Sequence, residues 1–193
     1  MLTFVICVLK IIYYKENYGN DLHSRKCRKI LVMRLLLKQN LFSGLFGFKI
    51  YNQDKEVVYV VKRKFSLKHI LTIYDSQNNE LGVVSGDSFR STAEFTLVEN
   101  GCCIGSVTKY PGFLKPKYDI GVNGWILKGN ILEWDYSIYT RNDRPIAYIS
   151  ATLGFPGTYA ITVCNPEDAL YVVMVVIAID AEKSTRVSHG FFE

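Results

Sequence analysis

One run of basic residues stands out in the body of the sequence. Lys62, Arg63, Lys64 and Lys68 place four cations within seven residues. Clustered ammonium and guanidinium groups bind phosphate, and near an anionic bilayer each adds a favourable attraction. The sequence therefore predicts a candidate anion- or headgroup-binding site at these four residues. A solvated strand end with its loop is the alternative interpretation of the same run.

The other reactive residues do not indicate catalysis. His69 directly follows the basic run, whose cations disfavour the protonation that a general base must undergo. Cys102 and Cys103 are adjacent in an expected strand, so we expect one to face the core and the other the solvent, as packing residues. The sequence has no motif for zinc, for nucleotide phosphates or for a serine nucleophile. We predict no catalytic residue, no metal and no cofactor.

The net charge of +5 belongs to the front of the chain. Residues 1–40 hold eight of the 23 basic residues and two of the 18 acidic ones, so the remainder is within one charge of neutral. Phosphate backbones need concentrated positive charge, and no nucleic-acid partner is expected. The five cysteines form an odd, irregular set, which favours free thiols in a reducing, cytoplasmic setting.

An apolar stretch opens the chain. Residues 1–14 are interrupted by Lys10 and fall short of the roughly 20 residues that a spanning helix needs. Three interpretations remain open: a membrane-interface anchor flanked by basic residues, a short helix on the body, or an extension upstream of a start at Met33. We expect residues 1–32 to be an extension and residues 33–193 to form one domain. The anchor interpretation would make the protein peripherally membrane-associated.

From Leu35 onward, β-rich runs alternate with polar turns. The first three turns lie at residues 52–55, 75–79 and 99–101. Their Asn and Gly residues suit the positive φ that tight hairpins require, and no sustained helical period interrupts the pattern. Short, evenly spaced strands predict a mainly β, antiparallel meander that closes into a barrel or sandwich. We expect Trp125 and Trp134 to lie in its core; a platform for a ligand is the alternative interpretation.

The tail departs from this pattern. The sequence Asn165-Pro166-Glu167-Asp168 supplies an N-cap residue, a proline and two carboxylates, which together indicate a helix start. Residues 169–179 are apolar throughout, so a helix here must be enclosed on every face. Many of them are β-branched, and a central strand is the alternative. The residues expected to form the core of this helix are Leu170, Val173, Met174, Val176 and Ile177.

The order of these hairpins and the helix resembles the LURP-one-related family, which shares the Tubby C-terminal-like fold with phospholipid scramblases. The resemblance covers roughly residues 34–186 and is carried by Tyr74–Leu81, Val98–Gly105, Gly124–Tyr136 and Asn165–Asp180. It implies a closed barrel of about twelve antiparallel strands around the C-terminal helix, without catalytic residues. For Tubby relatives it implies phosphoinositide binding, and for scramblases membrane and Ca²⁺ association. This chain lacks their cysteine-rich run and spaced acidic loop.

Two function hypotheses follow. The first is a non-catalytic binding module that recognises an anionic phospholipid or membrane surface. The second is an interaction or scaffold domain whose partner is a protein of unknown identity. Salt separates them, because recognition of headgroups by Lys and Arg weakens as ionic strength rises.

Overall fold

The computed structural model describes six stretches of the chain. They are residues 32–38, 47–64, 69–87, 92–113, 116–152 and 158–189, with side chains of the last described as far as Lys183. The expectations for residues 1–31, for Lys68 and for the other intervening segments lie outside the described residues.

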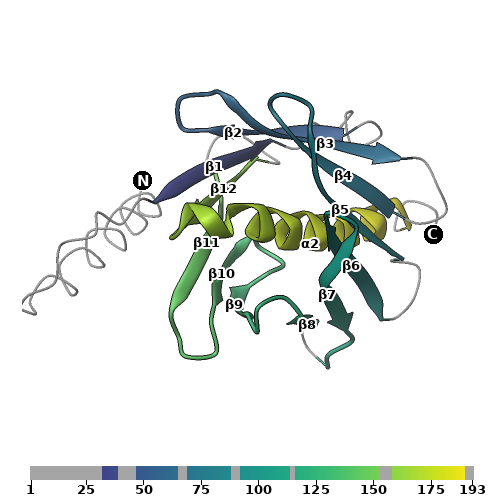
Figure 1. Cartoon of the computed structure of the whole chain (residues 1–193). Coiled ribbons are helices and arrows are strands. Elements are labelled where there is room, and N and C mark those ends of the chain that lie inside the picture. The colour runs from purple at the N-terminus through teal and green to yellow at the C-terminus, as the bar shows by residue number, and fades with distance from the viewer. Residues whose placement is uncertain are drawn as a thin grey trace, which may run out of the picture.

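In the described residues, twelve strands are followed by a helix (Figure 1). The first six strands are β1 (Met33–Lys38), β2 (Gly47–Asn52), β3 (Val57–Lys64), β4 (His69–Asp75), β5 (Glu80–Asp87) and β6 (Ala93–Glu99). The second six are β7 (Cys102–Tyr110), β8 (Lys117–Ile120), β9 (Ile126–Asn130), β10 (Asp135–Tyr139), β11 (Pro145–Ala151) and β12 (Thr158–Val163). A single 3₁₀ turn, η2 (Pro166–Asp168), leads into α2 (Ala169–His189).

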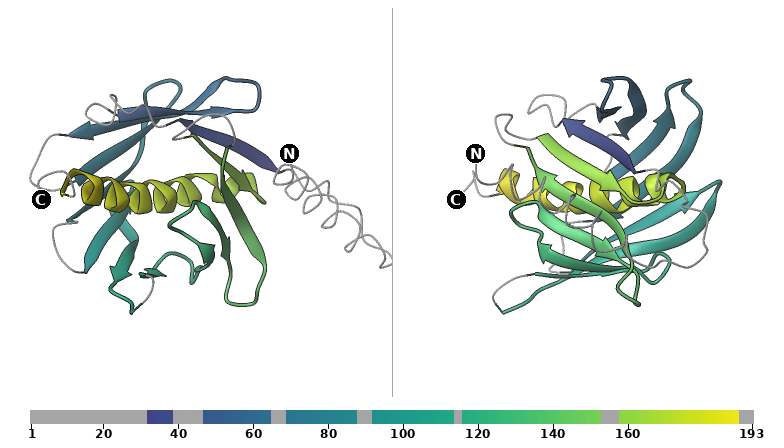
Figure 2. Two further views of the ribbon diagram at one scale, coloured as in Figure 1. Left: turned by 180° about the vertical axis from the view of Figure 1, so that it is seen from behind. Right: turned by 90° about the vertical axis from the view of Figure 1, so that its left-hand side faces the viewer.

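The strands form one antiparallel sheet that curls around α2 (Figures 1 and 2). Its order is β8-β7-β6-β5-β4-β3-β2-β1-β12-β11-β10-β9. Chain neighbours pair with one another, and β1 pairs with β12 to join the two halves. The end strands β8 and β9 complete a nearly closed barrel. The predicted fold class is therefore confirmed.

In three hairpin turns, the side chain of the first residue accepts hydrogen bonds from main-chain N–H groups of the same turn. In the β2–β3 turn, Oδ1 of Asn52 accepts hydrogen bonds of 2.9 Å from the main-chain N–H groups of Asp54 and Glu56. In the β4–β5 turn, Oδ1 of Asp75 accepts from the residues two and four positions on, at 2.9 and 2.8 Å. In the β10–β11 turn, the Thr140 hydroxyl accepts from the residue four positions on, at 3.1 Å. Asn, Asp and Thr thus favour these turns, because their side chains bond to the backbone of residues two to four positions further on.

Each of these turns also holds a non-glycine residue at positive φ, and the one in the β2–β3 turn is the exposed Lys55 at φ 65°. Because L residues are strained there, replacing Lys55 by Gly should stabilise the fold by up to about 1 kcal/mol. Gln53→Gly, in the same turn but at negative φ, should destabilise it by roughly 0.5–1 kcal/mol. Urea unfolding of both variants measures the difference. Equal losses would contradict the left-handed conformation of Lys55.

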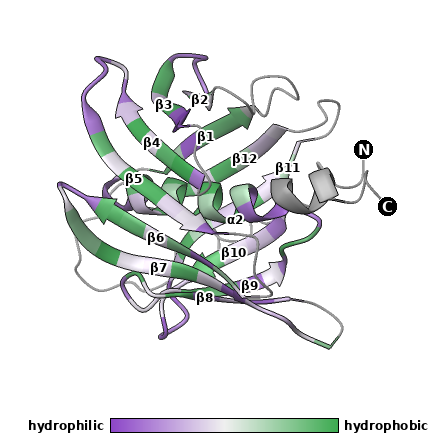
Figure 3. Ribbon diagram, turned by 90° about the vertical axis from the view of Figure 1, so that its right-hand side faces the viewer, coloured by the Kyte–Doolittle hydropathy of each residue, from purple (hydrophilic) through white to green (hydrophobic). Residues whose placement is uncertain are grey.

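The inward-facing residues of the strands and the whole width of α2 form one apolar core. Figure 3 shows the apolar α2 enclosed by strands whose colour alternates along their length. Strand alternation produces this pattern, because successive side chains face opposite sides of the sheet. Trp125 and Trp134 are 3% and 8% exposed, which confirms their expected place in the core.

The helix forms as the tail sequence predicted. Oδ1 of Asn165 caps the first turn by accepting a 3.4 Å hydrogen bond from the Glu167 N–H, and Pro166 occupies the first helical position. Every residue from Val172 to Ile179 is fully buried. Leu170 is half-buried and packs at the edge of the core. Enclosure on all faces offsets the poor helix propensity of the β-branched residues, since burying each such side chain contributes about 1.5–3 kcal/mol.

The expectation for the paired cysteines was wrong. Cys102 and Cys103 are both exposed free thiols, although one was expected to face the core. They are the first two residues of β7 and directly follow the Asn100-Gly101 turn at one end of the strand. The register then shifts, so that Val98 pairs with Cys103 but Leu97 pairs with Gly105. This bulge separates the pair from the regular alternation that follows it.

Candidate functional site

The basic run of β3 divides between the two faces of the barrel wall. Lys62 and Lys64 are exposed, whereas Arg63 is half-buried on the inward face with Val61. Period-two alternation causes the division, and applied to the sequence it would have separated Arg63 from its neighbours. The three described members of the predicted site, Lys62, Arg63 and Lys64, are therefore not brought to one face, and Lys68 lies outside the described residues.

Arg63 belongs to a polar set inside the barrel. Its guanidinium group contacts Nδ1 of His69 at the start of β4. Burial lowers the pKa of Arg63, and the nearby Asp180 of α2 acts in the opposite direction. Burial and the Arg63 charge also lower the pKa of His69, and its ring lies 6.1 Å from that of Phe95. We therefore interpret Arg63 and His69 as structural residues at this end of the barrel.

Lys62 is held in place on the outer face. Its Nζ donates a 2.6 Å hydrogen bond to Oδ1 of Asn78 and lies 4.1 Å from the centre of the Tyr74 ring. Both partners come from the β4–β5 hairpin. Neither is a carboxylate, so the charge of Lys62 is positioned without being neutralised.

A third outward lysine, Lys49, was missed by sequence reasoning. The register pairs Gly47 with Lys62 and Lys49 with Val60, which makes Lys49 and Lys62 diagonal neighbours on one face, about 7–8 Å apart between Cα atoms. Lys49 is exposed, and Gly47 opposite Lys62 contributes no side chain between them. The basic run at residues 62–68 gives no signal for Lys49, because only the register of the β2–β3 hairpin places Lys49 beside Lys62. We call Lys49, Lys62 and Lys64 the basic band.

The basic band has no acidic residue among its strand neighbours. The segments β2 and β3 contain no Asp or Glu, and β4 contains only Asp75 at its last residue. The outward residues of β4 that pair with β3 are Ile70, Thr72 and Tyr74. The band therefore presents positive charge beside hydroxyl and apolar groups.

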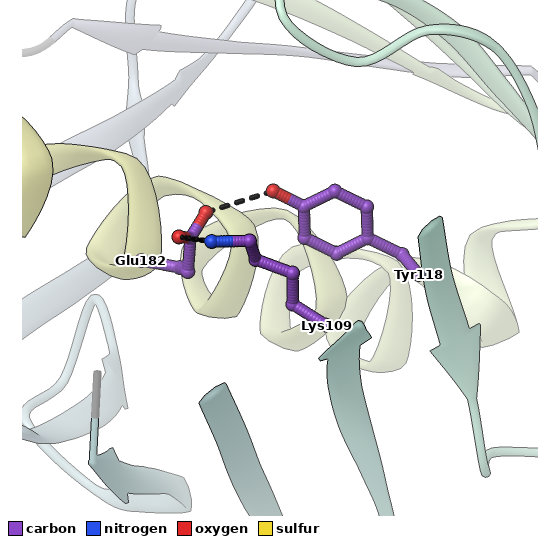
Figure 4. Close-up of polar contacts among 3 residues, drawn as sticks. All are labelled: Lys109, Tyr118 and Glu182. Atoms are coloured by element: carbon purple, nitrogen blue, oxygen red, sulfur yellow. Dashed lines mark hydrogen bonds and ion pairs between the residues drawn. The ribbon is translucent and has the colours of Figure 1, made fainter. Parts of the chain in front are cut away.

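A buried polar cluster inside the barrel is centred on Glu182 of α2 (Figure 4). Its two carboxylate oxygens accept hydrogen bonds from Nζ of Lys109 on β7, at 2.6 Å, and from the Tyr118 hydroxyl on β8, at 2.8 Å. The side chains of Lys109 and Glu182 are 10% and 4% exposed. Burial raises the pKa of Glu182, and burial together with this carboxylate raises that of Tyr118.

A second buried phenol faces the same region. Tyr136 is 2% exposed, and burial followed by the charge of Asp180 raises its pKa well above the ordinary value. Its hydroxyl is one of the buried polar atoms of the described residues that find no protein hydrogen-bond partner. Phenols whose pKa is raised by burial and a carboxylate that is paired with a lysine suit a structural polar cluster.

Two further features are absent from the described residues. They contain no group of three His, Cys, Asp or Glu side chains arranged to hold a metal ion. None of the described helical segments combines the length and the apolar character that crossing a bilayer requires.

Comparisons with known proteins agree with this architecture. The profile of the LURP-one-related family matches residues 33–180. The uncharacterised protein YxjI of Bacillus subtilis is 24% identical over 150 residues, which span 77% of this chain and 93% of that protein. A solved structure of a protein from Arabidopsis thaliana has a TM-score of 0.55 at 16% identity, covering 79% of this chain and 92% of the other. The predicted family is confirmed: the chain belongs to the LURP-one-related family.

Proposed function

We propose that this domain is a non-catalytic binding module that recognises an anionic phospholipid surface through the basic band. The observation that supports the proposal is the band itself. Lys49, Lys62 and Lys64 are exposed on neighbouring strands that carry no carboxylate on that face. Family membership and the barrel fold favour a non-enzymatic binding domain in general, and the band adds the chemistry of a specific ligand.

The expected strength follows from the charge. Each lysine near an anionic bilayer contributes about 1 kcal/mol, so the basic band contributes roughly 3 kcal/mol, about a hundredfold in affinity. The range of this attraction is set by the Debye length, which is about 10 Å at 0.1 M salt and about 3 Å at 1 M. Binding should therefore be weak, reversible and sensitive to salt.

The placement of Lys62 favours a defined contact with a headgroup. Asn78 and Tyr74 restrict the side chain, so less rotamer freedom is lost when a phosphate binds. Because an ammonium group has three donors, the one bond to Asn78 leaves capacity for an anionic oxygen.

Sedimentation of the full chain with vesicles tests the proposal. Vesicles with and without phosphatidylserine are compared across a salt series, using the parent and the variant Lys49→Gln, Lys62→Gln, Lys64→Gln. A matched control carries Lys55→Gln, Lys117→Gln and Lys128→Gln, three exposed lysines on other parts of the surface. Both variants have the same net charge, and both retain residues 1–31.

We expect the band variant to lose roughly tenfold to a hundredfold in binding to anionic vesicles, and the control to stay within about threefold of the parent. Equal losses in the two variants would show a nonspecific charge effect and contradict the proposal. Binding by the parent and both variants alike would place the membrane contact outside the basic band. An absence of parent binding at low salt would favour the protein-partner hypothesis.

A further inference from the structure

The barrel has one seam. Every other pair of neighbouring strands is joined by a hydrogen-bonded ladder, but in the described residues no ladder joins β8 to β9. The two strands nevertheless lie side by side, connected through residues 121–125 (Figure 1). Main-chain groups on their facing edges therefore lack the mutual hydrogen bonds that hold the rest of the wall.

One side of the seam is attached to α2 through Glu182. Its bonds to Lys109 and Tyr118 reach β7 and β8, the last two strands on that side (Figure 4). Both oxygens of the carboxylate are used, and the ion pair is almost completely shielded from water. A charge-assisted hydrogen bond of this kind is stronger than a neutral one.

The next residue, Lys183, is attached to the other side. Its Nζ donates hydrogen bonds of 3.0 Å to the carbonyl oxygens of Ile131 and Leu132 in the β9–β10 turn. The same ammonium group lies 3.9 Å from the centre of the Trp134 ring. Successive helical residues are about 100° apart around the axis, which allows Glu182 and Lys183 to reach opposite sides.

The turn that receives Lys183 is itself under strain. Trp134 has φ +56°, a conformation that is rare for a bulky residue. Stacking of its ring on Tyr159 at 3.9 Å and the hydrogen bond of 3.0 Å from the Ala151 N–H to its carbonyl hold it there. Strained positions persist where surrounding contacts fix them, and they are common at segments that switch.

We propose that the seam between β8 and β9 is the part of the barrel that opens, and that Glu182 and Lys183 of α2 form the clasp that holds it shut. The clasp substitutes side-chain bonds from the enclosed helix for the missing ladder. Because each residue holds a different side, release of either one frees the seam as a whole. Opening exposes the facing edges of β8 and β9 and loosens their pairing with β7 and β10, while the other ladders stay closed.

Amide hydrogen exchange of the folded full chain tests the clasp. The variants are Lys183→Gln and Glu182→Gln, which remove one charge each; Glu182→Gln also keeps the side-chain size. Lys128→Gln is the control: this β9 lysine pairs with Asp143 at 2.6 Å on the surface, with side chains 49% and 72% exposed. Exchange is followed in β8 and β9, and in β3 and β4 as a distant reference.

Each clasp variant should accelerate exchange in both β8 and β9 roughly tenfold to a hundredfold, while β3 and β4 stay within about threefold of the parent. The decisive observation is acceleration of β8 in Lys183→Gln, because Lys183 contacts the β9–β10 side. If Glu182→Gln accelerates exchange only in β8 and Lys183→Gln only in β9, the two residues make local contacts alone, and the proposal is overturned. Uniform acceleration of all strands, or none, would overturn it as well.

Discussion

Replacing Val176 by Asp abolishes soluble folding; this is the largest effect that we expect from a single substitution. Val176 is fully buried in the middle of α2, and its immediate neighbours Val175 and Ile177 are fully buried too. An isolated carboxylate there has no partner, so it must either be ionised in an apolar core or take up a proton at a cost. The expected loss exceeds about 5 kcal/mol, comparable with the whole stability of an ordinary domain.

Val176→Ala separates the charge from the loss of packing. That variant removes two methyl groups and should fold with a loss of about 2–3 kcal/mol. Soluble yield and circular dichroism melting of both variants provide the measurement. A Val176→Asp protein that melts like the parent would mean that α2 is not enclosed, and it would contradict the barrel described above. Val173 is equally buried, and Val173→Asp should behave in the same way.

The second large effect is expected from Lys109→Met. The substitution preserves the apolar part of the side chain but leaves Glu182 buried with the Tyr118 hydroxyl as its remaining partner among these three residues. Loss of one member of a buried ion pair costs about 3–5 kcal/mol, because the other charge stays desolvated. Urea unfolding at pH 7 measures this loss. The exposed pair of Lys128 and Asp143 provides the control, and Lys128→Met should cost less than about 1 kcal/mol.

A double variant distinguishes the effect of the remaining buried charge from that of lost packing. Adding Glu182→Gln to Lys109→Met removes the carboxylate charge that Lys109 no longer balances and should recover part of the stability, a coupling that a double-mutant cycle quantifies. The deficit of Lys109→Met alone should also shrink as the pH is lowered. Burial raises the pKa of Glu182, so the destabilising carboxylate is present above that pKa and is neutralised as the pH falls through it. If the stability losses of the two single variants simply add in the double variant, and the loss of Lys109→Met does not change with pH, the role of the ion pair is contradicted.

Local interactions explain what the sequence by itself determined. The turns at Asn52 and Asp75 were predictable because their side chains bond to backbone groups two and four residues away. The start of α2 was predictable because Asn165 and Pro166 act within a single turn. Its burial followed from a run that is apolar on every face. Alternation within β3 likewise contains the information that places Arg63 on the opposite face from Lys62.

Only the tertiary structure decided which residues act together. Lys49 joins the basic band through the register of a hairpin, which a shift of one residue would turn to the other face. The cysteine pair is exposed because it begins β7 directly after a turn, and a bulge separates it from the regular alternation that follows. Glu182 meets Lys109 across 73 positions, and Lys183 meets Ile131 across 52. Contacts over such separations depend on barrel curvature and helix rotation, and these arise from the packing of the whole core rather than from the residues that make the contacts.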